Sequence, residues 1–101
     1  MVDETNPDYG YYEAVYKCLE RYHKMLLDRG DSLGGFTSSE VKLMEFIFES
    51  VHAINDEKPL LKLNRWLGYI QGTLIAMGIT DVETERNWTR PLFRPLDFPE
   101  D

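Results

Sequence analysis

Hydrophobic residues recur at helical spacing along this chain and predict three long amphipathic helices. The first runs from about residue 7 or 8 to Arg29, and Gly30 is expected to form its C-cap. Cys18 falls about 100° from its core-facing line on a helical wheel, so it is expected off the core. The apolar stripe that faces the core consists of Tyr12, Val15, Tyr16, Leu19, Tyr22, His23 and Leu26.

The second helix begins with the clearest local signal in the sequence. Thr37 and Glu40 have the spacing of a capping box, and Phe36 and Val41 flank them at the positions of a hydrophobic staple. The helix is expected to continue to about Asn55. Its core-facing residues are Leu43, Met44, Ile47, Val51 and Ile54.

A third helix, over about residues 59–77, has two apolar faces. One is a core seam, made of Leu60, Leu63, Leu67, Ile70, Leu74 and Met77. The other holds Leu61, Arg65, Gly68, Tyr69, Gly72, Ile75 and Ala76. Glycine inside a helix costs about 1 kcal/mol relative to alanine, so glycines repeated every four residues indicate close packing. The partner is either another helix of this chain or a second copy, and the unused apolar face predicts a homo-oligomer.

After this helix the chain is expected to change character. Gly78 and Ile79 suit a Schellman C-cap, and residues 80–83 repeat the capping-box pattern, which predicts a short fourth helix to about Trp88. Because proline interrupts helices, residues 91–101 are predicted to form an extended proline-rich C-terminal arm. Its prolines are Pro91, Pro95 and Pro99, and its apolar anchors are Leu92, Phe93, Leu96 and Phe98.

The resulting prediction is an all-α, homo-oligomeric protein with three main helices, a short fourth helix and an extended arm. At 101 residues, the chain is long enough for one core, so residues 1–101 form a single domain with a flexible N-terminus over residues 1–6. Polar residues interrupt the longest apolar segment, residues 60–79, so no membrane span is expected. The first residues lack the pattern of a signal peptide and there is only one cysteine, which suggests a cytoplasmic protein.

The net charge of −7 disfavours general binding to nucleic acids and membrane surfaces. Two Glu-x-x-His patterns, at residues 20–23 and 49–52, have the spacing used in di-iron bundles. However, His52 lies about 140° from the core line of its helix, and the third helix has no glutamate. No metal, cofactor or nucleophilic triad is therefore expected, and the chain is not predicted to be an enzyme.

Positive charge is concentrated near the C-terminus. Arg86 and Arg90 are four residues apart, and guanidinium groups bind phosphate in a bidentate manner. Aromatic rings nearby could stack on a nucleobase. Alternatively, Glu83 and Glu85 neutralise the arginines and the segment is only structural. The candidate ligand-binding residues are Arg86, Arg90, Thr89, Trp88, Asn87, Phe93 and, from the third helix, Arg65.

The run LNRWLGYIQGTLIAMGITDVETERNWTRPLF, residues 63–93, resembles a module of small bacteriophage accessory proteins. Its E-R-x-x-T-R-P part is similar to a segment of phage signal sponges of the anti-Thoeris and anti-CBASS kind. Those are oligomers that sequester cyclic nucleotide or cyclic ADP-ribose messengers between subunits without cleaving them. The resemblance implies ligand contacts from Arg86, Thr89 and Arg90, in the cytoplasm of an infected bacterium.

A second hypothesis rests on the acidic residues. Acids at positions 40, 45, 49, 56 and 57 could imitate DNA or inhibit a host enzyme by direct protein contact. A solvated helix face accounts for the same acids equally well.

Overall fold

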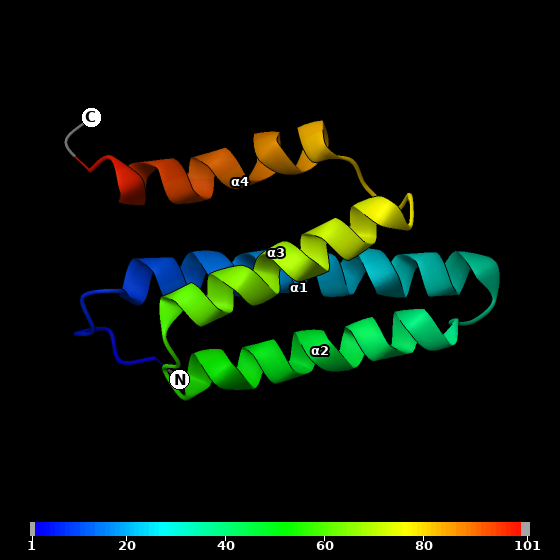
Figure 1. Cartoon of the computed structure of the whole chain (residues 1–101), viewed down its shortest axis with the longest axis horizontal. Helices are drawn as coiled ribbons and strands as arrows, with labels where there is room; N and C mark the ends of the chain where they lie inside the picture. Colours follow the sequence, from blue (N-terminus) through cyan, green and yellow to red (C-terminus); the bar gives the residue numbers. More distant parts are fainter. Residues whose placement is uncertain (1, 100–101) are drawn as a thin grey trace.

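The computed structural model describes residues 2–99, which form four helices and no strand. The helices are α1 (Tyr9–Leu33), α2 (Ser38–Asn55), α3 (Leu60–Ala76) and α4 (Val82–Asp97). Helix α1 packs against the other three, and α2 also packs against α3. Figure 1 shows α2 and α4 at opposite edges of the molecule, with α1 and α3 between them. The all-α prediction is confirmed.

The core lies where the hydrophobic periodicity placed it. Tyr22, Leu26, Ile70 and Leu74 are completely shielded from solvent. Tyr16 is 40% exposed and His23 lies at the boundary, so the predicted stripe of α1 was too wide at these two positions. The other buried residues of the predicted stripes are Tyr12, Val15, Leu19, Leu43, Ile47, Ile54, Leu63 and Leu67.

Helix α1 extends beyond its predicted end, so Gly30 is a helical residue and not the C-cap. The ring of Phe36 occupies the space that a Cβ at position 30 would need. Gly34 ends the helix instead, in the left-handed conformation at φ 78°. Gly30 is therefore explained by a close side-chain contact, which helical spacing alone does not reveal.

The capping box of α2 is confirmed. The Glu40 amide donates to the Thr37 hydroxyl at 3.2 Å, and the Thr37 amide donates to the Glu40 carboxylate at 2.8 Å. Glu40 is 2% exposed and also accepts a hydrogen bond from Arg29 at 2.9 Å. One of the five acids of the expected acidic face is therefore buried and already neutralised.

Helix α3 ends in the predicted Schellman motif. The amide of Ile79 donates to Leu74 and that of Gly78 to Ile75, each at 3.0 Å, and Gly78 has φ 74°. Gly68 and Gly72, however, have open space around the position of a Cβ. The idea that these glycines pack another helix of the same chain is therefore wrong. The glycine face of α3, by which we mean Leu61, Gly68, Gly72 and Ala76, is exposed.

Helix α4 is the largest departure from the prediction. It begins one residue later than expected, with Asp81 as its N-cap at 2.8 Å from the Thr84 amide, and it continues through Pro91 and Pro95. Residues 91–97 are therefore helical and not an extended arm; residues 100 and 101 of that arm lie outside the described part. Proline deprives only the carbonyl four residues earlier of its donor. Because both rings are on the exposed side of α4, water can satisfy those carbonyls.

An ion pair between the buried Glu85 and the half-buried Arg21 holds α4 against α1. Glu85 is 4% exposed, and its carboxylate accepts hydrogen bonds from Arg21 at 3.1 and 3.3 Å and from Thr80 at 2.6 Å. The guanidinium of Arg21 also lies 4.7 Å from the centre of the Trp88 ring. Burial acts to raise the pKa of Glu85, but the hydrogen bonds from Arg21, Thr80 and Tyr22 outweigh it, so the pKa is below its ordinary value.

Further contacts along α4 complete this interface. Leu92 and Phe93 pack against the core, and Leu96 fills the space beside Gly10 of α1. Near the end of the helix, the hydroxyl of Tyr11 donates to Asp97 at 2.7 Å. The helix is thus attached along its length, although almost entirely through α1.

The N-terminal residues, expected to be flexible, contain hydrogen-bonded turns in the part that the structure describes. Asp3 accepts hydrogen bonds from Thr5, and the side-chain amide of Asn6 donates to the Glu57 carboxylate at 2.9 Å. Residue 1 lies outside the described part. Within residues 2–99 no helix combines the length and the hydropathy that a membrane span requires.

We predict that the attachment of α4 weakens in acid because of Glu85. A depressed folded-state pKa stabilises the native state above the unfolded value, about 4.3, and that contribution is lost as pH falls through the folded pKa. Glu85→Gln should lower the free energy of unfolding by about 2 kcal/mol at pH 7. The difference from wild type should shrink as the pH falls below about 4.3, measured by urea unfolding. Glu83→Gln is the matched exposed control; an equal loss in that variant would contradict the prediction.

Gly72→Ala should raise the free energy of unfolding by about 1 kcal/mol, because the added methyl group meets open space and alanine is the better helix former. The measurement is thermal unfolding at a concentration where light scattering gives the monomer mass. Gly30→Ala is the contrasting variant, since its methyl group would collide with Phe36. Destabilisation by Gly72→Ala in the monomer would show that the face is covered within the chain.

Candidate anion-binding surface on helix α4

Three arginines form a row on the exposed side of α4. Arg86, Arg90 and Arg94 are each four residues apart, so successive side chains leave the helix about 6 Å apart along its axis. We call these three residues the arginine row. Each of them is exposed to solvent.

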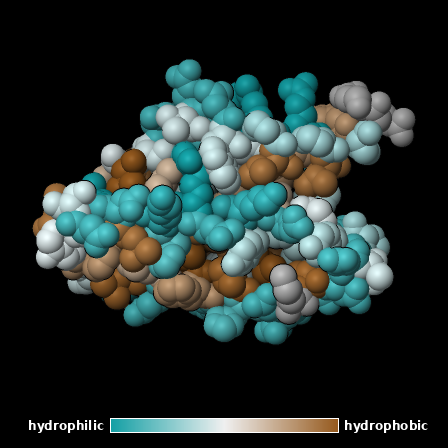
Figure 2. Space-filling model, turned by 180° about the vertical axis from the view of Figure 1, so that it is seen from behind, coloured by the Kyte–Doolittle hydropathy of each residue, from teal (hydrophilic) through white to brown (hydrophobic). Residues whose placement is uncertain are grey.

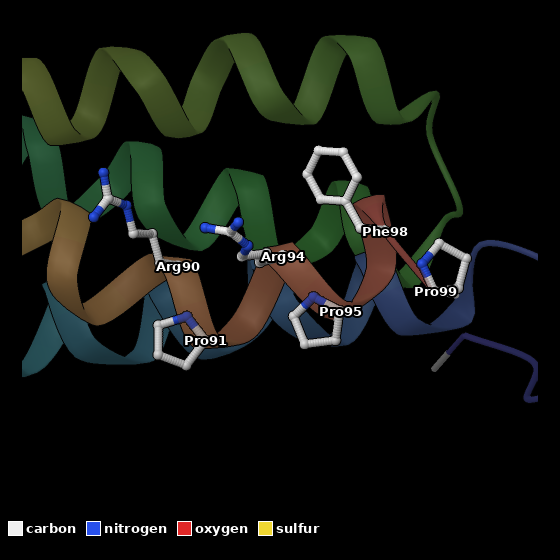
Figure 3. A pocket seen from close by; sticks show the side chains of 6 residues that line it. All are labelled: Arg90, Pro91, Arg94, Pro95, Phe98 and Pro99. Carbon is white, nitrogen blue, oxygen red and sulfur yellow. The ribbon is translucent and has the colours of Figure 1, made fainter. Parts of the chain in front are cut away.

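A shallow hollow of about 440 Å³ lies along the C-terminal half of this row. Figure 3 shows that Arg90 and Arg94 extend along one edge of α4 and are followed by the ring of Phe98, whereas the prolines follow a neighbouring edge. Phe98 is 57% exposed, and the guanidinium of Arg94 lies 5.9 Å from its ring centre. The hollow is lined by Arg90, Pro91, Arg94, Pro95, Phe98 and Pro99.

The arginine row has no acidic partner in the described structure. Residues 2–99 contain two ion pairs, Arg21–Glu85 and Arg29–Glu40, and neither involves the row. Glu85, which could have neutralised Arg86 or Arg90, points into the interface with α1 instead. The sequence left open whether Arg86 and Arg90 pair with Glu83 and Glu85. Residues 2–99 contain no such ion pair.

The remaining predicted ligand residues do not gather around the row. Trp88 and Phe93 pack against the core, where Arg21 covers the Trp88 ring. The hydroxyl of Thr89 donates to the Glu85 carbonyl at 2.8 Å, so it is bonded within its own helix. Asn87 is exposed on α4, and Arg65 is exposed on α3 but does not line the hollow.

Thr89 and Phe93 instead line a separate cleft of about 300 Å³ between α1, α3 and α4. Its other polar residues include Tyr11, Asn64 and Gln71. Gln71 donates to the hydroxyl of Tyr22 at 2.6 Å, beside the buried Glu85 network. The residues that line this cleft come from α1, α3 and α4, and none of them belongs to the arginine row.

Arg94 and Phe98 were not predicted as parts of this surface, because the fourth helix was expected to end before Pro91. A signal was present in the spacing. Positions 86, 90, 94 and 98 repeat every four residues, and so do the prolines at 91, 95 and 99. Prolines that recur on one face are compatible with a helix whose other face is buried.

Three other residues were considered for catalysis or metal binding, namely Cys18, His23 and His52. Cys18, expected off the core, is completely buried because α4 covers that side of α1, and burial raises the pKa of its thiol to about 12. The ring of His23 packs edge-on against Phe48 at 4.9 Å, and His52 is exposed. No cluster of three His, Cys, Asp or Glu side chains suited to a metal ion occurs in residues 2–99.

We found no protein family that matches the chain, and no match among curated proteins or solved structures.

Proposed function

We propose that this protein binds a small anionic nucleotide and sequesters it without cleaving it, as a phage-encoded protein that removes an immune signal in an infected bacterium. The observation that carries the proposal is the arginine row, three exposed guanidiniums without an ion pair in residues 2–99. The phage setting and the cyclic nature of the ligand rest on the resemblance of residues 63–93 to signal sponges.

The charge of the chain favours a small ligand over a nucleic acid. The net charge is −7, so a long polyanion meets repulsion from most of the surface. A ligand the size of a nucleotide can contact the row alone, and each guanidinium can donate two hydrogen bonds to a phosphate. Exposed pairs of this kind weaken in salt, which gives the binding a measurable signature.

Within the proposed site, Arg86 and Arg90 hold the phosphate groups and Arg94 extends the same row. Phe98 offers an exposed ring for a base, a role first considered for Trp88 and Phe93. Asn87 can add a hydrogen bond, whereas Arg65 is a contact only if another copy brings it close.

We further propose that the protein works as a homo-oligomer. The support is the glycine face of α3, where Leu61 is 78% exposed and the space around Gly68 and Gly72 is open. A second copy could approach this backbone closely, as small residues permit.

Ligand binding is tested by calorimetry with a panel of cyclic dinucleotides, cyclic trinucleotides and cyclic ADP-ribose isomers. We expect at least one to bind, and the ligand to be recovered unchanged after the protein is denatured. Replacing both Arg86 and Arg90 by Ala should weaken the affinity at least about a hundredfold, because two charge-assisted contacts are lost.

The matched control reverses the charge of Glu45 and Glu49 on α2. These changes should leave ligand affinity unaltered, whereas they would abolish inhibition by a DNA mimic or a protein-directed inhibitor. No binding across the panel would refute the sponge hypothesis, and recovery of a chemically altered ligand would indicate an enzyme.

The oligomer is tested by light scattering. At about 100 µM we expect a mass above the 11.9 kDa of one chain for the wild type. Gly68→Leu combined with Gly72→Leu should return the monomer mass, since the new side chains block close approach of a second backbone. A wild-type monomer at this concentration would exclude the proposed assembly.

A further inference from the structure

A second hollow, on another side of the molecule, gathers exposed aromatic rings. It lies between α2 and α3, has a volume of about 670 Å³, and contains none of the residues of α4. Small-molecule sites usually fall between about 300 and 1,000 Å³. The residues that matter for its chemistry are Ser39, Lys42 and Phe46 of α2 and Trp66, Tyr69 and Thr73 of α3. We call it the aromatic pocket.

Three rings of this pocket pack together without being buried. The ring centres of Phe46 and Trp66 are 5.1 Å apart, and those of Phe46 and Tyr69 are 5.5 Å apart at an angle of 83°. Phe46 and Trp66 are half-buried, and Tyr69 is 62% exposed. Two other exposed rings have an evident local role: Phe36 covers Gly30, and Phe48 packs against His23.

The pocket also has a positive rim. Lys42 lines it and takes part in neither of the ion pairs found in residues 2–99. The ammonium of Lys62 lies 5.0 Å from the centre of the Trp66 ring, but Lys62 does not line the pocket. Glu45 and Glu49, the exposed acids of the same helix, do not line the pocket.

Hydroxyl groups complete the lining. The hydroxyl of Thr73 donates to the Tyr69 carbonyl at 2.8 Å, so its oxygen remains able to accept a hydrogen bond from a ligand. Ser39 adds a second hydroxyl at the opposite helix. Apolar ring faces, the hydroxyls of Ser39 and Thr73, and the positive charge of Lys42 match a planar ligand that is charged at one end.

We propose that the aromatic pocket binds a planar aromatic group that bears a negative charge, the chemistry shared by a nucleotide and an aromatic carboxylate. The flat group stacks on the exposed face of Tyr69 and against Trp66, and the anion contacts Lys42. This site goes beyond the proposed role of the arginine row, since the two surfaces share no residue.

The test uses the full chain and four probes: AMP, indole-3-acetate, ribose 5-phosphate and benzyl alcohol. The first two combine a ring with an anion, and the others have only one of these features. We expect AMP or indole-3-acetate to bind most tightly and to shift the indole N–H signal of Trp66 but not that of Trp88 in an NMR titration. Tighter binding of AMP would indicate a nucleotide as the ligand, and tighter binding of indole-3-acetate would indicate an aromatic carboxylate.

Variants then locate the binding. Tyr69→Ala should weaken it roughly tenfold, because one stacking face is removed. Lys42→Gln should weaken it about threefold for the anionic probes. Since Tyr69 and Lys42 are both exposed, neither change should unfold the chain. The matched controls, Tyr16→Ala and Lys17→Gln on α1, should leave the affinity unchanged.

Three results would overturn the assignment. They are no binding of either aromatic anion at millimolar concentration, binding that survives Tyr69→Ala, and equal affinity for AMP and ribose 5-phosphate. Binding lost only on replacement of Arg86 and Arg90 would place the ligand on α4; it would support the proposed function and refute the aromatic pocket. Binding lost on replacement of Tyr69 or Lys42 but not of Arg86 and Arg90 would support the pocket and leave the arginine row without a ligand.

Discussion

The contact on which the placement of α4 depends is the ion pair between the half-buried Arg21 and the buried Glu85. Helix α4 has most of its contacts with α1, and two prolines within it remove main-chain hydrogen bonds. A helix of this kind has little stability by itself. The Glu85 carboxylate, which accepts hydrogen bonds from Arg21 and Thr80, therefore makes a main contribution to holding α4 against the core.

The same pair also places the negative charge of Glu85 on the inner face of α4, away from the exposed arginines of the row. The inward direction of Glu85 satisfies Arg21 and leaves the outward arginines without an acid from their own helix. Removing one partner of a buried ion pair is strongly destabilising, so Glu85 is not free to neutralise Arg86 or Arg90. A structural requirement in the interface with α1 thereby produces the unpaired positive surface on which the proposed function rests.

Signals carried by a few neighbouring residues were sufficient to predict much of this fold. The Thr37–Glu40 capping box and the Schellman motif at Gly78 are local, and both appear as expected. Gly30 contacts Phe36, and the prolines of α4 lie in a helix that packs against α1. Local rules do not include these tertiary contacts, and they misplaced the C-terminal ends of α1 and α4. Cys18 was likewise expected off the core but is completely buried, because a helical wheel does not show which other helices pack against α1.

The candidate site inherits this dependence on tertiary contacts. Arg86 and Arg90 could be nominated from their spacing, but Arg94 and Phe98 join them only because the helix continues past Pro91. If α4 detaches and its weakened helix unwinds, the arginines lose their common direction. A ligand that requires the aligned row binds only the attached state, and so stabilises it in proportion to the logarithm of ligand concentration. The ligand binding proposed for the outer face of α4 would therefore be thermodynamically coupled to the Arg21–Glu85 contact on its inner face, although no residue belongs to both.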